Sequence, residues 1–85
     1  MASTGSMTLQ EYFGAIGLKE SAVSTRIEKL TGVHVSRDLL LAATHYKPEE
    51  RQAMALPKAE ALCQFLSVEM GRTVTIQDVK GLKVV

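Results

Sequence analysis

The sequence predicts a mainly α-helical protein, a compact bundle of about four to five short helices that contains a helix-turn-helix and ends in a small β-hairpin. Apolar residues recur at helical spacing through most of the chain, which favours helices that each bury one face. Residues that begin or end helices, among them Thr8, Gly17, Ser36 and Pro57, separate these stretches. Only residues 72–76 alternate with β-branched side chains, which favours a strand near the end of the chain.

The length and composition are those of a single domain. Of the 85 residues, 46% are hydrophobic, and a second hydrophobic core would need roughly 50 residues of its own. We therefore expect one helical domain over residues 8–85, with residues 1–7 as a disordered leader or a tag remnant. In so short a chain some apolar surface stays exposed in the monomer, which favours a homodimer or a bound partner.

The first helix has a clear beginning and end. Thr8 is a favourable N-cap, and Glu11 in the first turn completes a capping box. Gly17 ends the helix after Ile16, because glycine readily adopts the left-handed conformation that closes many helices. Leu18 is expected to fill the corner before the next helix. The apolar face consists of Leu9, Tyr12, Phe13 and Ile16.

A second helix is expected over residues 20–31, with Gly32 at its end. A short helix, a glycine-containing turn and a second amphipathic helix are the pattern of a helix-turn-helix. The apolar face of the second helix consists of Ala22, Val23, Ile27 and Leu30, and its polar face of Ser21, Ser24, Thr25, Glu28 and Lys29, with Arg26 at the edge.

Residues 16–30, IGLKESAVSTRIEKL, resemble the turn and recognition helix of bacterial helix-turn-helix regulators, in particular the LysR-type pattern. In that family Ala-Val-Ser begins the recognition helix, and the Ile and Leu that follow anchor it to the core. The resemblance implies that Ser21, Ser24, Thr25 and Arg26 face double-stranded DNA and that Lys19 contacts a phosphate. Phe13 stands where the family has a small Ala, Lys19 replaces the usual Ser or Thr cap, and no large effector domain follows.

The polar face of this helix has two interpretations. Serine and threonine hydroxyls donate to phosphates and base edges, while Arg26 and Lys29 can pair with phosphate or guanine. Glu28 is discordant, because DNA repels a carboxylate unless the carboxylate accepts from cytosine. A solvated helix face carries much the same residues, and a net charge of +1 gives little attraction for nucleic acid. A role in protein–protein interaction therefore stays open.

Further helices follow this pair. Ser36 caps a helix over residues 37–46 that is apolar most of the way round, and Pro48 and Pro57 each begin another. The first proline helix is short and charged, and the second extends to Gly71. The apolar stripe of the second is wider than a surface helix needs, which favours a homodimer seam over central burial. The residues of this seam are Leu62, Phe65, Leu66 and Met70.

Residues 72–85 are expected to form the hairpin, with a turn at residues 78–81. The alternative is a last helical turn capped by Thr75, with Asp78 as the partner of the cap. The segment carries more basic than acidic side chains, which suits either a wing that touches the DNA backbone or a strand edge protected by lysines. These basic residues are Arg72, Lys80 and Lys83.

The sequence carries no pattern of catalytic, cofactor-binding or metal-binding residues. It has no glycine-rich phosphate loop and no His/Cys cluster, and His34 and His45 have no ligand partners at suitable spacing. Cys63 lies in an apolar helix and is expected to be a buried, reduced thiol of a cytoplasmic protein. No apolar run approaches the ~20 residues that a membrane span requires. We therefore expect a non-enzyme with no cofactor, no metal and no membrane segment.

Two functional hypotheses follow. The first is a small helix-turn-helix transcriptional regulator that acts as a homodimer and places residues 21–30 in the major groove of double-stranded DNA. Its two copies would read half-sites about one helical turn apart. The second is a non-enzymatic helical interaction module or adaptor that binds another protein. The Ala-Val-Ser pattern favours the first hypothesis, and the near-neutral charge favours the second.

Overall fold

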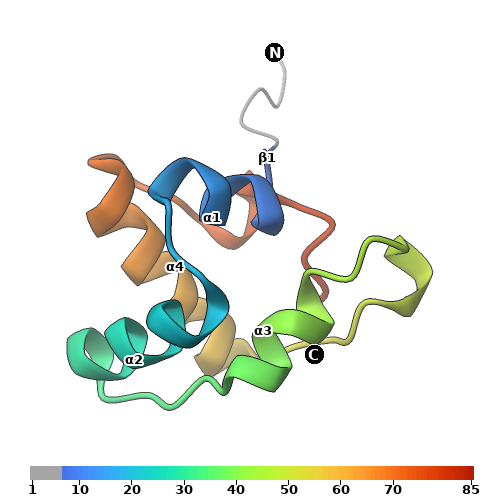
Figure 1. Ribbon diagram of the computed structural model, residues 1–85, viewed down its shortest axis with the longest axis horizontal. Coiled ribbons are helices and arrows are strands. Elements are labelled where there is room, and N and C mark those ends of the chain that lie inside the picture. Colours follow the sequence, from blue (N-terminus) through green and yellow to red (C-terminus); the bar gives the residue numbers. More distant parts are fainter. Residues whose placement is uncertain (1–6) are drawn as a thin grey trace.

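The computed structural model describes residues 7–85, and this part of the chain is mainly helical, as the sequence predicts (Figure 1). Its elements are β1 (Met7–Thr8), α1 (Leu9–Ile16), α2 (Glu20–Thr31), α3 (Arg37–Ala43), a 3₁₀ turn (Pro48–Glu50), α4 (Leu56–Met70), a second 3₁₀ turn (Ile76–Asp78) and β2 (Val79–Lys80).

Helix α4 is the central support of the fold. It packs against both α1 and α2, and α2 also packs against α3 (Figure 1). The main contacts of α1 are with β1 and α4, so α1 and α2 are not a closely packed pair. The helices that are both consecutive and closely packed are α2 and α3, joined by residues 32–36.

The local signals that begin and end the helices are confirmed. Thr8 and Glu11 form a reciprocal capping box, with N–O distances of 2.7 Å and 3.2 Å. Ser36 caps α3, because its hydroxyl accepts from the backbone N–H of Leu39 at 3.1 Å. Gly17 and Gly32 end α1 and α2 in the left-handed conformation, with φ values of 80° and 76°.

The broad apolar stripe of α4 faces the interior of this same chain. Leu62 and Leu66 are 0% exposed and Phe65 is 2% exposed, and Met70 is partly buried against the same core. Side chains that are already buried have no surface left to place against a second copy. The expected homodimer seam on Leu62, Phe65 and Leu66 was therefore wrong, and central burial explains the stripe.

The C-terminal segment contains a strand, but that strand does not pair within the segment. Strand β2 lies parallel to β1, with Met7 opposite Val79, and Val84 forms a parallel bridge with Met54. The expected hairpin over residues 72–85 is therefore replaced by pairing with distant parts of the chain. The alternative, a helical turn capped by Thr75, is present.

The capped turn explains why the hairpin does not form. The Asp78 carboxylate accepts from the backbone N–H and the hydroxyl of Thr75, at 2.8 Å and 3.0 Å. These bonds lower the pKa of Asp78, and the nearby Arg72 charge lowers it further. Residues 75–78 thus form a 3₁₀ turn where a first hairpin strand would have to continue.

Two other boundaries differ from expectation. The charged helix expected to start at Pro48 shrinks to one 3₁₀ turn. The backbone of this segment pairs with the C-terminal segment instead, because the N–H of Met54 donates to the carbonyl of Lys83 at 2.8 Å. Helix α3 ends at Ala43 instead of Tyr46. Met7, the last residue of the expected leader, lies in β1, whereas residues 1–6 lie outside the described residues.

Candidate nucleic-acid interface on helix α2

Helix α2 has one buried side and one side open to solvent. Val23 and Ile27 are 0% exposed and anchor the helix in the core. Because residues three and four apart share a face, this anchor turns the residues between them outward. The exposed residues proposed from the sequence as DNA contacts are Lys19, Ser21, Thr25, Arg26 and Lys29, and Ser24 is half-buried at the edge.

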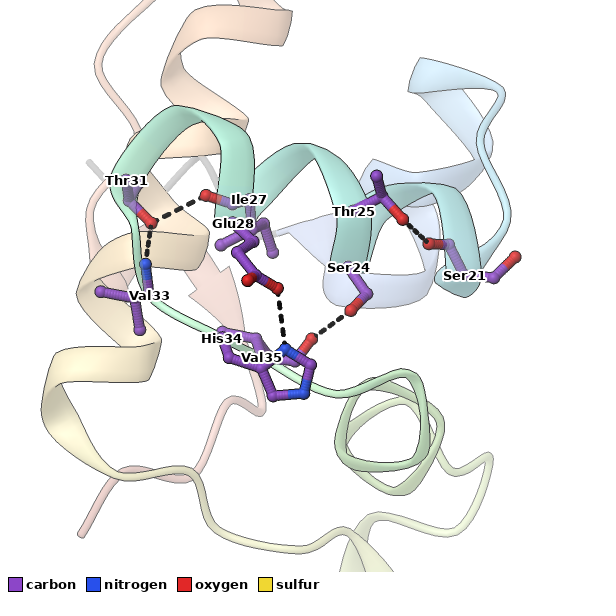
Figure 2. Close-up of polar contacts among 9 residues, drawn as sticks. All are labelled: Ser21, Ser24, Thr25, Ile27, Glu28, Thr31, Val33, His34 and Val35. Atoms are coloured by element: carbon purple, nitrogen blue, oxygen red, sulfur yellow. Dashed lines mark hydrogen bonds and ion pairs between the residues drawn. The ribbon is translucent and has the colours of Figure 1, made fainter.

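The hydroxyl groups of Ser24, Thr25 and Thr31 on α2 donate to backbone carbonyls of the protein (Figure 2). Ser24 Oγ donates to the carbonyl of Val35 at 2.5 Å, which ties α2 to the segment that leads into α3. Thr25 Oγ1 donates to the carbonyl of Ser21 at 3.1 Å, within the helix. Ser24 therefore has a structural role, while the exposed Thr25 can exchange its local bond for a ligand.

Glu28 has a partner that the sequence did not indicate. Figure 2 shows the His34 ring turned toward it, with Nδ1 of His34 3.0 Å from Oε1 of Glu28. Both side chains stay exposed, at 66% for His34 and 57% for Glu28. A protonated His34 would neutralise this carboxylate, which is the least favourable residue on the face for an approaching phosphate.

The basic side chains of α2 are available for an external partner. Within residues 7–85, Lys19, Arg26 and Lys29 take part in none of the ion pairs. Lys19 occupies the N-cap position of α2, and its side chain makes no hydrogen bond to the first turn of the helix. Thr25, Arg26 and Lys29 line one shallow depression on the outward side together with Ala22.

The structure adds an apolar groove beside this face. The groove has a volume of about 260 Å³. Leu30 is 42% exposed, although the sequence places it on the apolar face of its helix, and Val68 on α4 is 60% exposed. On a helical wheel, Leu30 lies to one side of the buried Ile27, and Val68 lies to one side of the buried Phe65. Both positions are at the edge of the apolar stripe of their helix. We define the α2/α4 groove by its lining residues, Arg26, Lys29, Leu30, Phe65, Val68 and Glu69.

The expected helix-turn-helix is present only in part. The turn at residues 17–19 follows α1 as predicted, and Leu18 packs against the core. However, α1 contacts mainly β1 and α4, and the consecutive helices that pack closely are α2 and α3. The side chain at the exposed start of α3 is Arg37, which pairs with the neighbouring Asp38 at 3.5 Å.

Cys63 is a buried thiol, as expected. Burial raises its pKa from 9.0 to about 11, and the negative charges of Asp78 and Glu60 add to this shift. No group of three or more metal-ligating side chains occurs within residues 7–85. None of the helices in that range is long and apolar enough to cross a membrane.

No protein-family model matches this chain, and no curated protein or solved structure matches it either. The indications of function are therefore the geometry and the charges of α2 and its neighbours.

Proposed function

We propose that this protein is a small cytoplasmic DNA-binding regulator that places the outward side of α2 against double-stranded DNA. The observation that carries the proposal is the pair Arg26 and Lys29, which lie one turn apart on an exposed helix face without an ion-pair partner in residues 7–85. Thr25 lines the same depression and adds a hydroxyl group. Guanidinium, ammonium and hydroxyl groups are donors for phosphate oxygens and base edges.

The packing of α2 against α3 supports this proposal. Two consecutive helices that pack closely around a short connection present a rigid convex surface, which the major groove accepts. Ser24 strengthens this unit through its bond to Val35. In this arrangement Arg37 at the start of α3 is a second candidate contact, and a direct test can separate it from α2.

The charge of the face predicts modest affinity. Three cations, Lys19, Arg26 and Lys29, are available to neutralise phosphates, while Glu20 and Glu28 on the same helix oppose them. Three phosphate contacts correspond to a slope of roughly −3 in a plot of log affinity against log salt concentration. Binding should therefore be strongest at low ionic strength.

The experiment is a fluorescence anisotropy titration of duplexes selected from a randomised DNA pool, at two salt concentrations. We expect Arg26→Ala and Lys29→Ala each to weaken binding and to reduce the salt slope by about 1. Lys47→Ala, which removes an exposed lysine from the loop beyond α3, is the matched control and should bind like the wild type. If Arg37→Ala alone weakens binding, α3 and not α2 faces the DNA. If the wild type selects no duplex and binds none at low salt, the proposal is wrong.

The α2/α4 groove favours a second candidate function, a protein–protein interaction module. Leu30 and Val68 are exposed apolar side chains beside the buried Phe65, and apolar surface rimmed by charges is typical of docking sites. In this case the protein binds no DNA, and substitutions at Leu30 or Val68, but not at Thr25, abolish binding of its protein partner.

A further inference from the structure

The α2/α4 groove combines an apolar floor with rims of opposite charge. Leu30 from α2 and Val68 from α4 supply exposed apolar surface above Phe65. Arg26 and Lys29 line the α2 side, and Glu69 lines the α4 side. No ion pair joins these three side chains to one another or to other residues in the range 7–85.

This distribution of charge is complementary to itself. If two copies meet around a two-fold axis that runs along the groove, α2 of each copy lies over α4 of the other. Arg26 and Lys29 of one copy then face Glu69 of the second copy, and the same contacts occur twice. Leu30 of each copy meets Val68 of the other at the centre, where apolar contact is least exposed to water.

We propose that the α2/α4 groove is the docking site for a second copy of this chain. An acidic helix from another protein would gain from Arg26 and Lys29 but would be repelled by Glu69. A basic helix would gain from Glu69 but would be repelled by Arg26 and Lys29. Only a partner with both signs in matching positions satisfies both rims, and a second copy has them by symmetry.

The contact is expected to be weak and dependent on concentration. Two half-exposed apolar side chains and a few ion pairs amount to much less than the 1,200 Å² or so that stable interfaces bury. The dimer should therefore form at high protein concentration and weaken with salt, because exposed ion pairs are screened.

Self-association has a consequence that depends on the function proposed above. Arg26 and Lys29 would serve both DNA and the second copy, so each ligand hides part of the surface that the other needs. DNA binding and dimer formation would then oppose one another, and the form that binds DNA would be the monomer. Self-association can be measured without DNA, so its test is independent of the proposed DNA binding.

The first test is sedimentation velocity of the pure protein over a wide concentration range at low salt. The wild type should shift from the mass of one chain toward twice that mass. Val68→Glu should raise the dissociation constant at least about tenfold, because it places a charge at the centre of the contact. Leu56→Glu makes the same kind of change at an apolar residue that is 44% exposed at the opposite end of α4 and does not line the groove, and it should associate like the wild type. A wild type that stays monomeric throughout overturns the proposal.

The second test uses charge reversal, which does not depend on packing. Glu69→Arg should weaken association, and adding Arg26→Glu in the same chain should restore it, because the opposite charges then face each other again. Glu60→Arg makes the same substitution elsewhere on α4 and should have no effect. Far-UV circular dichroism confirms that each variant is folded. A folded double variant that associates no better than Glu69→Arg overturns the two-fold arrangement.

Discussion

Helices α4 and α2 pack against each other, but α4 buries many more side chains than α2 does. Helix α4 buries six side chains, from Ala59 to Leu66, whereas α2 buries only Val23 and Ile27. The long buried stripe of α4 holds α1 and α2 in place. Helix α2 uses a narrow anchor and leaves most of its surface to solvent. The comparison separates the part of the molecule that maintains the fold from the part that can bind a partner.

The largest predicted effect is in the stripe of α4. Leu62→Ala should lower the free energy of unfolding by about 2–5 kcal/mol, because Leu62 is fully buried and its removal leaves a cavity. Urea denaturation followed by circular dichroism measures this change. Gln64→Ala, on the exposed side of the same helix, is the control and should change stability little. A small loss for Leu62→Ala would mean that α4 is not the central support.

Cys63 tests the burial of the same helix through its chemistry. The native thiol should react with a thiol reagent at pH 8 far more slowly than the thiol of the urea-unfolded chain, because its pKa is raised to about 11 and it is buried.

The raised pKa of Cys63 also predicts how stability depends on pH. The unfolded thiol loses its proton near pH 9.0, before the folded one, so this contribution to stability is complete below pH 9.0 and is lost as the pH rises toward about 11. Cys63→Ala should show a weaker decline over that range. Equal slopes for the two proteins would contradict the shift.

The smallest effects are expected on α2, and they separate its two sides. Ser24→Ala should cost about 0.5–1.5 kcal/mol, because it removes the bond to the carbonyl of Val35. Thr25→Ala should stay within about 0.5 kcal/mol of the wild type, since alanine has the higher helix propensity and Thr25 is exposed. Thermal denaturation of both variants measures the difference. If Thr25→Ala were the more harmful, the outward side of α2 would have a structural role.

The internal hydrogen bond of Ser24 also determines which variants are suitable for the DNA experiment. Ser24 resembles a DNA contact in sequence, but its hydroxyl already has an internal acceptor. A loss of DNA binding in Ser24→Ala could therefore follow from a change between α2 and α3. Arg26 and Lys29 are better probes, because their removal leaves the bonds in Figure 2 unchanged.

Much of the fold is set by short-range sequence. Thr8, Ser36, Gly17 and Gly32 begin or end helices through bonds and backbone angles within a few residues, so their effects can be predicted from neighbours in the chain. The exposed positions of Lys19, Thr25, Arg26 and Lys29 were likewise predictable from the helical period. Whether any of them binds DNA stays a prediction.

Long-range contacts decided the features that sequence patterns left open or misassigned. An apolar stripe such as Leu62, Phe65 and Leu66 looks the same whether it faces its own core or a second copy, and only the positions of α1 and α2 place it inside. The β-branched run at residues 72–76 forms no strand, and the strand of this segment lies later, at Val79–Lys80. Met7 and Met54, far away in the chain, supply its partners, because the folded helices bring them alongside Val79 and Val84.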